Sequence, residues 1–360
     1  MKTQDFVNSE RYKEYTMKKT TVIALILLLV LSLLAFSGCS ALLPKAQPEI
    51  LKSYPKQTAP EQVVKTQTGW AMLHNVYGGR DYTVSAGKDL ESAITVYSAN
   101  DVSIWYFEAN DNGIVWCEKS TEFYTYKAYV FKTEQVETML QVPVADGFQP
   151  ANVGIFGNVA YYCLIDYEKQ EVRAIAYDLS SQATNDVYTA AFEEENQPYF
   201  INLEATYLSF ACSDFITVLD VQTNQTVYRA SLPDDVKHVF SVSYDSKNET
   251  CALYYADGDS EDIGILRKGE TAISSLFTFS ENYYAYHDKI ECYDGHVYWI
   301  AQANVSGYVT DHYKLIDYNY LEHKVSETSK TIDFCRAGED IYLLRFNKSG
   351  DYTHIDLCKD

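Results

Sequence analysis

Basic residues are scarce in this 360-residue sequence: 29 lysines and arginines stand against 50 aspartates and glutamates, a formal net charge of −21. A protein that grips a nucleic-acid backbone needs clustered cations to replace the counterions of the phosphates. The same deficit disfavours docking on an anionic lipid surface. We therefore expect no nucleic-acid partner, and we favour a generally acidic, non-adhesive surface over an acidic patch for one cationic ligand.

Local catalytic and metal-binding motifs are also missing. The seven histidines are dispersed and form neither HExxH nor a metal-spaced pair, so the sequence supports no zinc site. It contains no GxSxG, GxxxxGK[ST] or GxGxxG segment, which removes the commonest serine-hydrolase and phosphate-binding signatures. We expect no cofactor. An enzymatic function stays open, because an enzyme can assemble its site from distant loops.

The eight cysteines lack the spacing of metal or redox pairs. Cys39 lies near the N-terminus, and the other seven are more than 20 residues apart, which excludes CxxC motifs. An odd number cannot pair completely. These seven lie in apolar runs such as GIVWC and VAYYC, where a thiol behaves as a small buried hydrophobe. We expect free, buried thiols at the following positions: Cys117, Cys163, Cys212, Cys251, Cys292, Cys335 and Cys358.

One long apolar run lies near the N-terminus. Lys18 and Lys19 precede an uncharged stretch from Val22 to Phe36, which ends in small residues and a cysteine. This pattern is typical of a secretory signal. Met17 directly precedes the basic pair and is an alternative start of translation. The run is close to the length that spans a membrane, so a retained signal anchor is the alternative interpretation.

The end of that run, Phe36-Ser37-Gly38-Cys39, resembles the lipobox of bacterial lipoproteins, although Phe36 stands where leucine is usual. The resemblance implies that residues 1–38 are a lipoprotein signal peptide and that Cys39 is lipidated. It also implies a mature chain anchored by lipid at the extracytoplasmic face of the cell membrane. Residues 40–68 contain four of the eight prolines, so we interpret residues 39–68 as a tether.

Apolar runs recur at a nearly constant step in the rest of the chain. Their equivalent positions are Ile114, Val159, Tyr207, Cys251, Val297 and Ile341, which gives steps of 45, 48, 44, 46 and 44 residues. Turn pairs such as Asn112-Gly113 and Asp294-Gly295 precede several copies. A second alternating run, such as VRAIAYDL, follows each copy, and four copies have a further run, such as VETMLQV. Runs of this length that are rich in Tyr, Val, Ile and Phe predict strands.

Four strands in each step of about 45 residues resemble the blade of a β-propeller. The resemblance rests on period and strand count, and no signature of a propeller subfamily is present. The last copy ends after its third strand, so we expect a strand from the other end to complete it, with SAITVYSAN (92–100) as the candidate. We predict an all-β propeller over residues 69–360 with six four-stranded blades. There are seven blades if residues 69–91 form a partial blade rather than a cap.

Two groups of acidic residues are candidates for a specific role. Asp257, Asp259 and Asp262 belong to the densest acidic cluster and form a weak candidate for calcium binding through hard oxygens. They lack the EF-hand arrangement and fall where two strands must turn, so we favour a solvated hairpin. A periodic set of aspartates follows the third strands, and we expect these residues to bond their turns: Asp178, Asp220, Asp317 and Asp356.

A lipid-anchored propeller without catalytic motifs predicts a non-catalytic binding or scaffold module of the bacterial cell surface, for a protein, peptide or glycan. The alternative is an extracellular enzyme that acts on cell-wall or other polymers with acidic loop residues. A sensory or assembly role beside a transporter or envelope complex is a third hypothesis. Carboxylates that converge at the axial mouth would indicate the enzyme. A broad aromatic or apolar patch on the rim would indicate the scaffold, although most of the 32 tyrosines fit strand patterns and are expected to be structural.

Overall fold

The computed structural model describes residues 48–75, 80–192, 200–204, 206–211, 214–258, 260–279, 283–303, 313–347 and 354–360. All of them belong to one compact unit, Pro48–Asp360. The predicted signal peptide, the alternative start at Met17 and the lipidation site Cys39 lie outside the described residues. No helix in the described part of the chain has the length and apolar character needed to cross a membrane.

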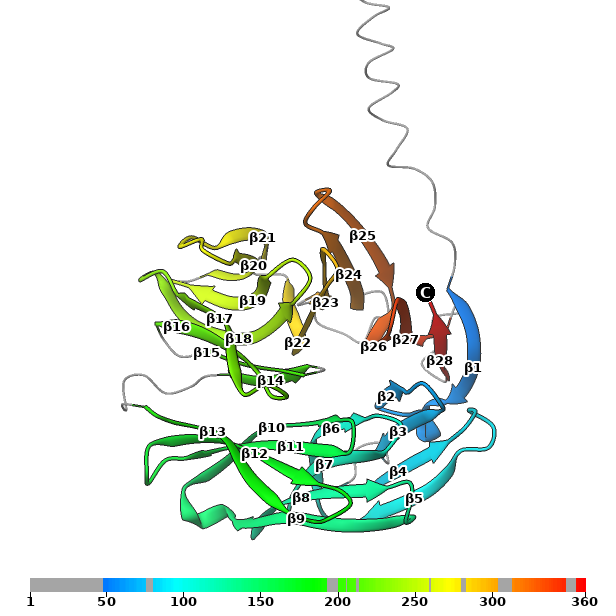
Figure 1. Ribbon diagram of the computed structural model, residues 1–360. Helices are drawn as coiled ribbons and strands as arrows, with labels where there is room; N and C mark the ends of the chain where they lie inside the picture. Colours follow the sequence, from blue (N-terminus) through cyan, green and yellow to red (C-terminus); the bar gives the residue numbers. More distant parts are fainter. Residues whose placement is uncertain are drawn as a thin grey trace, which may run out of the picture. The chain divides into compact units, whose positions relative to one another are not determined.

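Seven four-stranded antiparallel sheets are formed by the described residues, and they are the blades of a β-propeller ring (Figure 1). In six of them the strands pair in chain order, from an inner first strand to an outer fourth strand. Adjacent first strands contact one another around most of the ring. The predicted all-β propeller is confirmed, and its blade number is seven.

Blades 1 to 3 occupy residues 62–191. Blade 1 consists of β2 (Gln62–Lys65), β3 (Trp70–Asn75), β4 (Tyr82–Gly87) and β5 (Ile94–Ala99). Blade 2 consists of β6 (Ser103–Ala109), β7 (Gly113–Lys119), β8 (Phe123–Val130) and β9 (Gln135–Pro143). The short 3-10 helix η2 (Val144–Asp146) leads to blade 3, which consists of β10 (Phe148–Phe156), β11 (Val159–Asp166), β12 (Glu171–Asp178) and β13 (Thr184–Ala191).

Blades 4 to 7 complete the ring. Blade 4 consists of β14 (Phe200–Glu204), β15 (Tyr207–Ala211), β16 (Phe215–Asp220) and β17 (Gln225–Ser231). Blade 5 consists of β18 (Val236–Asp245), β19 (Thr250–Asp257), β20 (Ser260–Arg267) and β21 (Ser274–Phe279). Blade 6 consists of β22 (Tyr283–Tyr293), β23 (His296–Ala303), β24 (Tyr313–Asn319) and β25 (Lys324–Ser329). Blade 7 consists of β26 (Thr331–Ala337), β27 (Asp340–Phe346), β28 (His354–Lys359) and β1 (Glu49–Pro55).

The repeat identified in the sequence marks the second strand of blades 2 to 7, and blade 1 extends it. Trp70 in β3 lies 44 residues before Ile114 in β7. Gly69 and Gly113 precede these two residues in equivalent turns, where a Cβ would lie 2.4 Å from the carbonyl oxygen of Gly87 and 2.6 Å from that of Tyr129. Glycine is therefore required where the third strand approaches this closely.

The ring closes through the N-terminal strand. β1 pairs antiparallel with β28, from Glu49 opposite Lys359 to Pro55 opposite His354. The Ser53 hydroxyl donates to the Asp356 carboxylate at 2.6 Å. The prediction of a strand lent by the other end is confirmed, but its placement at residues 92–100 was wrong, because Ile94–Ala99 is the outer strand of blade 1. β1, β2 and the 3-10 helix η1 (Lys56–Thr58) also place much of the predicted 39–68 tether inside the propeller.

The core lies between neighbouring blades, because each sheet buries its faces against the next. Trp116, Trp299, Tyr126 and Tyr228 are the largest fully buried side chains. The Tyr126 hydroxyl donates to the Cys163 carbonyl of the next blade at 2.5 Å. The Tyr228 hydroxyl donates to the Leu266 carbonyl at 2.9 Å. These phenols join blades, as expected for structural tyrosines.

The described cysteines are also part of this buried core. All those described are free and buried, which confirms the prediction for six of the seven: Cys117, Cys163, Cys251, Cys292, Cys335 and Cys358. Burial raises the pKa of the Cys163 thiol to about 12, so it stays protonated and unreactive. Cys212 lies outside the described residues.

Candidate functional site

A cavity of about 350 Å³, here called the axial cavity, lies where the first strands of all seven blades converge. Its volume is at the lower end of the range for ligand sites, about 300–1,000 Å³. It is lined by Glu61 and Gln62–Val64, Trp105–Glu108, Asn152, Asn202, Glu204, Ser241, Lys289–Glu291, Asp333, Cys335 and Arg336. Because every blade contributes, the site exists only in the closed ring.

Negative charge predominates on the cavity wall. Five carboxyl groups face two cationic side chains: Glu61, Glu108, Glu204, Glu291 and Asp333 against Lys289 and Arg336. In an enclosed space with reduced solvent screening, such an excess produces a strong negative potential.

Arg336, near the end of β26, balances part of that charge. Its Nη2 lies 3.3 Å from a carboxylate oxygen of Glu204, and its Nε lies 3.5 Å from one of Glu291. The guanidinium carbon stands 3.8 Å from the centre of the Tyr293 ring, in cation–π contact. Ser243 donates a further hydrogen bond to Glu204 at 2.5 Å. Arg336 thereby links blades 4, 6 and 7 across the axis.

Lys289, in β22, balances a third carboxylate. Its ammonium lies 3.3 Å from Asp333 and donates to the Phe334 carbonyl, and it stands 4.6 Å from the centre of the Phe334 ring. Burial disfavours the charged form of Lys289, but the carboxylates of Asp333, Glu291 and Glu108 outweigh this effect and raise its pKa. Lys289 is therefore a permanent cation at neutral pH.

Glu108, in β6, has no hydrogen-bond or ion-pair partner among the described residues. Its side chain is open to the cavity, although protein surrounds it. This desolvation raises its pKa to about 7, with Lys289 opposing the shift and Glu291 adding to it. Burial and the neighbouring Glu291 likewise raise the pKa of Glu204 to about 7. Two carboxyl groups of one cavity therefore titrate near neutral pH.

This arrangement can do two things chemically. Ionised Glu108 can accept a cation, because its carboxylate has no direct ion-pair partner among the described residues. A carboxyl with a pKa near 7 is also suited to general acid–base work. The converging carboxylates are the feature that we expected of an enzyme, yet Glu204, Glu291 and Asp333 are paired with the chain's own cations, as in a structural ion network.

The calcium candidates lie elsewhere, at the hairpin between β19 and β20. Asp262 is 5% exposed, and its carboxylate accepts hydrogen bonds from Ser260 at 2.9 Å, from Ser275 at 3.3 Å and from Thr278. Asp257 ends β19 opposite Ser260, and Asp259 lies outside the described residues. Among the residues that the structure describes, no three histidine, cysteine or acidic side chains are grouped to hold a metal ion.

The periodic aspartates divide into two kinds. Asp178 accepts from the backbone of Ser180 and Ser181 at 2.9 and 2.7 Å, and Asp220 accepts from Gln222 N–H at 3.0 Å. The turn-bonding role is confirmed for these two.

The same prediction was wrong for Asp317 and Asp356. Asp317 lies 2.6 Å from His296 Nδ1, and Asp356 accepts from Ser53. In blade 6 the turn is instead bonded by Asn319, which accepts from the backbone of Leu321 and Glu322. His296 makes its second ring contact with Asn319 at 3.0 Å, so both ring nitrogens are engaged.

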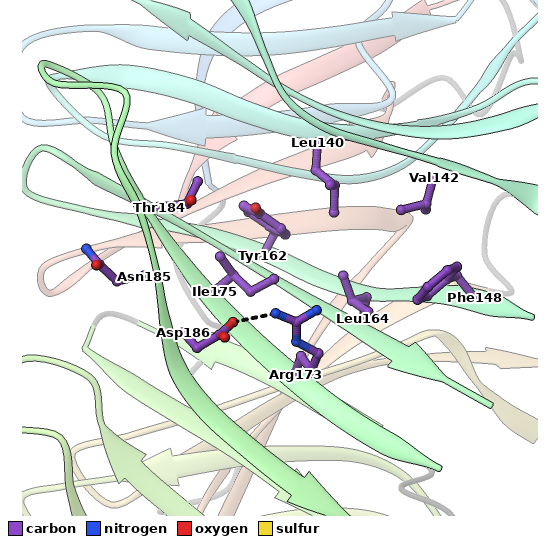
Figure 2. A pocket seen from close by; sticks show the side chains of 10 residues that line it. All are labelled: Leu140, Val142, Phe148, Tyr162, Leu164, Arg173, Ile175, Thr184, Asn185 and Asp186. Carbon is purple, nitrogen blue, oxygen red and sulfur yellow. Dashed lines mark hydrogen bonds and ion pairs between the residues drawn. The ribbon is translucent and has the colours of Figure 1, made fainter. Parts of the chain in front are cut away.

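A second hollow, of about 300 Å³ and here called the interblade cleft, lies between blades 2 and 3 (Figure 2). Leu140 and Val142 come from β9, and the other walls come from blade 3. Arg173 and Asp186 form an ion pair of 2.8 Å at this hollow. Sequence reasoning identified neither hollow.

No protein-family model matches this sequence, and no curated protein does. Solved structures match it in fold. The β-propeller domain of Cps50 (Swd1) from Myceliophteria thermophila has a TM-score of 0.51 at 9% identity, covering 86% of this chain and 99% of that one.

Two further structures are more distant. Prolyl oligopeptidase B from Galerina marginata has a TM-score of 0.48 at 10% identity and covers 83% of this chain, which spans 46% of that enzyme. A protein from Lactobacillus plantarum has a TM-score of 0.47 at 12% identity, covering 80% of this chain and 94% of that one. At 9% identity the likeness to the Cps50 (Swd1) domain shows the propeller fold alone.

Proposed function

We propose that the protein is a binding module of the bacterial cell surface, anchored at the extracytoplasmic face of the membrane through a lipid on Cys39. In this proposal the axial cavity receives a lysine or arginine side chain of a peptide or protein ligand. The main support for this proposal is that acidic side chains outnumber basic ones in the cavity, and that Glu108 has no ion-pair partner within the described residues. The lipobox-like FSGC at residues 36–39 supports the anchor.

The chain's own cations indicate how the cavity would bind a ligand. Arg336 and Lys289 each combine carboxylate contacts with the face of an aromatic ring. Trp105, which also lines the cavity, is 38% exposed and has the Lys119 ammonium 4.5 Å from its ring centre. A ligand cation at Glu108 would therefore find the same two kinds of partner: a carboxylate and an aromatic wall.

Binding of basic peptides to the purified full-length chain tests the cavity. A fluorescent octapeptide with alternating lysine and serine should bind, and its lysine-acetylated counterpart should not, because acetylation removes the charge. Binding should weaken as salt rises. The Glu108→Gln variant should lose about tenfold in affinity, which is about 1.4 kcal/mol.

The matched control is Glu327→Gln. Glu327 is an exposed carboxylate on the outer strand β25, 2.7 Å from Lys314, and its substitution should leave the affinity unchanged. Equal binding of the acetylated peptide would contradict the proposal. So would equal losses in the two variants, since that result would point to a general surface-charge effect.

The anchor has its own test. In the producing bacterium, wild-type chain should fractionate with membranes and incorporate radiolabelled palmitate, while Cys39→Ala should incorporate none, because the acyl chains attach to that sulfur. Wild-type protein that fractionates with membranes but carries no palmitate would instead indicate a retained signal anchor.

A second candidate function is catalysis with Glu108 as general acid, favoured by the pKa of about 7 for both Glu108 and Glu204. It predicts turnover of a cell-wall or other extracellular polymer and a bell-shaped pH profile. Incubation with peptidoglycan and with polysaccharide fragments distinguishes it from binding. Product release that Glu108→Gln abolishes would establish the enzyme, and saturable binding without product would establish the module.

A further inference from the structure

The interblade cleft is separate from the axial cavity in both position and chemistry. Its walls come from β9 of blade 2 and from β10 to β13 of blade 3, so it involves only two blades. Six of its ten residues are Leu, Val, Ile, Phe or Tyr: Leu140, Val142, Phe148, Tyr162, Leu164 and Ile175. A concave apolar wall with a few polar groups is the usual composition of a small-molecule site.

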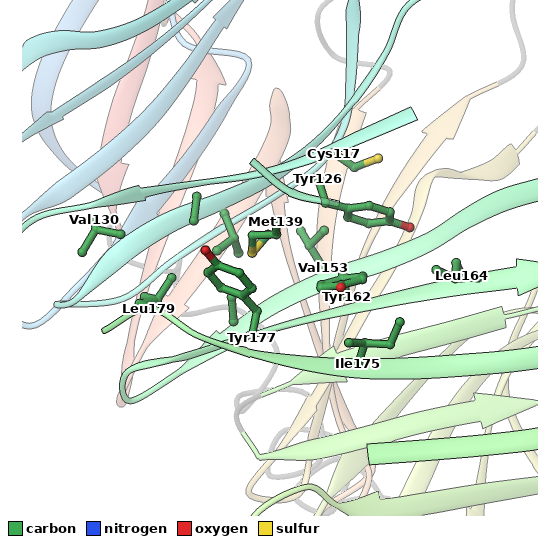
Figure 3. Packing of buried hydrophobic residues seen from close by; sticks show 13 residues of the cluster. Cys117, Tyr126, Val130, Met139, Val153, Tyr162, Leu164, Ile175, Tyr177 and Leu179 are labelled. Atoms are coloured by element: carbon green, nitrogen blue, oxygen red, sulfur yellow. The ribbon is translucent and has the colours of Figure 1, made fainter. Parts of the chain in front are cut away.

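The floor of the cleft is part of the packed core. Tyr162, Leu164 and Ile175 belong to the buried cluster between blades 2 and 3 (Figure 3). The Tyr162 ring packs on Tyr126 with centroids 4.9 Å apart. Interiors packed in this way resist deformation, so the cleft is preformed and a ligand would not have to open it.

The Tyr162 hydroxyl is the exception among the tyrosines of this cluster. Tyr126 donates to the Cys163 carbonyl, and Tyr177 donates to Glu137 at 3.0 Å. Tyr162 is 2% exposed and lines the cleft (Figure 2), yet its hydroxyl has no hydrogen-bond partner among the described residues. This hydroxyl is not sealed off from solvent, so a polar ligand group in the cleft can form a hydrogen bond with it.

Arg173 supplies a charge beside this hydroxyl. One of its terminal nitrogens donates to Asp186 at 2.8 Å, as the dashed line in Figure 2 marks. A guanidinium has five N–H donors, and the others of Arg173 have no partner within the described chain. Asp186 is 54% exposed and Arg173 30%, so solvent or a ligand can reach the pair. The remaining N–H donors of Arg173 can bind an acceptor group of a ligand, and the positive charge of the guanidinium favours an anionic acceptor.

We propose that the interblade cleft binds a small apolar carboxylate. The apolar body lies against Leu140, Phe148 and Ile175, and the carboxylate accepts hydrogen bonds from Arg173 and Tyr162. A carboxylate matches the planar guanidinium fork and is less hydrated than a phosphate, which suits an apolar wall. This site does not depend on the function proposed for the axial cavity.

Calorimetric titration of the full-length chain with 4-methylpentanoate and with phenylacetate tests the proposal. For ligands of this size we expect a Kd of about 1 mM or lower. The uncharged amides of the same acids should bind at least about tenfold more weakly, because they lose the charge-assisted bonds.

Two variants with a matched control locate the site. Tyr162→Phe removes only a hydroxyl and should weaken carboxylate binding about fivefold, the effect of about 1 kcal/mol for one hydrogen bond. Tyr161→Phe is the control, because Tyr161 is the preceding residue of β11 and packs on the opposite face, towards blade 4. It should leave the Kd unchanged. Arg173→Met keeps an apolar stem and should reduce binding to that of the amides.

Circular dichroism confirms that each variant is folded before titration. Equal Kd values for acid and amide would overturn the proposal, as would binding that survives both Tyr162→Phe and Arg173→Met. Absence of binding by wild-type protein at tens of millimolar would overturn it as well. Failure here leaves the basic-peptide test of the axial cavity untouched, since the two experiments share neither probe nor variant.

Discussion

The axial cavity and the interblade cleft are two hollows of similar volume, about 350 and 300 Å³, with opposite chemistry. The cavity is lined by residues from all seven blades, and five of the blades contribute charged side chains. The cleft is walled by apolar side chains from two blades that also form the core. The difference indicates that the repeat builds the apolar walls, whereas the residues that depart from it build the charged ones.

The two hollows also differ in how their side chains contribute to the stability of the fold. Burying apolar surface stabilises the ring at any ordinary pH, and the cleft inherits this rigidity from the cluster beneath it. The axial cavity instead concentrates like charges, whose cost depends on protonation. Core substitutions should therefore change stability most, and cavity substitutions should change binding and its pH dependence.

Truncation of the core beneath the cleft should produce the largest effect. Tyr126 is fully buried between blades 2 and 3, so Tyr126→Ala should lower the free energy of unfolding by about 3–5 kcal/mol. Tyr126→Phe removes only the bond to Cys163 and should cost about 1 kcal/mol. Guanidinium denaturation measures both. A loss for Tyr126→Ala no greater than that for Tyr126→Phe would contradict the view that apolar packing supports this region.

The second-largest effect should be a difference between the two hollows in how ligand affinity depends on pH. The pKa of about 7 for Glu108 and Glu204 means that both carboxyls gain protons as pH falls from 8 to 6. Cation binding in the axial cavity should weaken about tenfold over that range, since only the ionised form attracts a cation. Carboxylate binding in the cleft should stay constant, because guanidinium groups and simple carboxylates keep their charge between pH 6 and 8. Parallel titrations at pH 6, 7 and 8 measure this, and equal slopes would remove the distinction.

The sequence predicted the repeat because packing between blades imposes it. It left blade 1 open as either a partial blade or a cap over residues 69–91, because the prolines at 55 and 60 suggested a tether where β1 and β2 lie. Pro55 in fact ends β1, an outer strand whose free edge tolerates a residue without N–H. Local composition was therefore a poor guide where the chain's two ends meet.

The axial site was not predictable in the same way. Its charges are single residues inside apolar first strands, as in SIWYFEA with Glu108 and TIDFCRA with Asp333 and Arg336. They are far apart in sequence, and only ring closure brings them together. A charged residue inside an otherwise apolar strand was the available signal. The acidic turn at Asp257 gave the stronger sequence signal for a site, because its charged residues lie close together in the sequence.

The stability of the unliganded protein offers a smaller test of the cavity. The folded state raises the pKa of Glu108 above the ordinary value of 4.5 to about 7, so it favours the protonated form. Its contribution is complete below pH 4.5 and is lost as pH rises through 7. Glu108→Gln imitates the protonated form, and its Tm should exceed that of wild type by about 2 °C at pH 8 but equal it near pH 4.5. Glu327→Gln should show no such difference, and a gain that is independent of pH would contradict the argument.

The smallest stability effect is expected at the rim of the cleft, where it is paired with an effect on binding. Asp186 is more than half exposed and holds one nitrogen of Arg173, and exposed pairs of this kind contribute about 0–1 kcal/mol. Asp186→Asn should therefore change the Tm by less than about 1 °C. It should also tighten carboxylate binding about threefold, because the ligand no longer competes with a resident carboxylate for the guanidinium. If the substitution weakens binding instead, Asp186 orients Arg173 rather than competing for it, and the cleft resembles the axial cavity in needing its own ion pair.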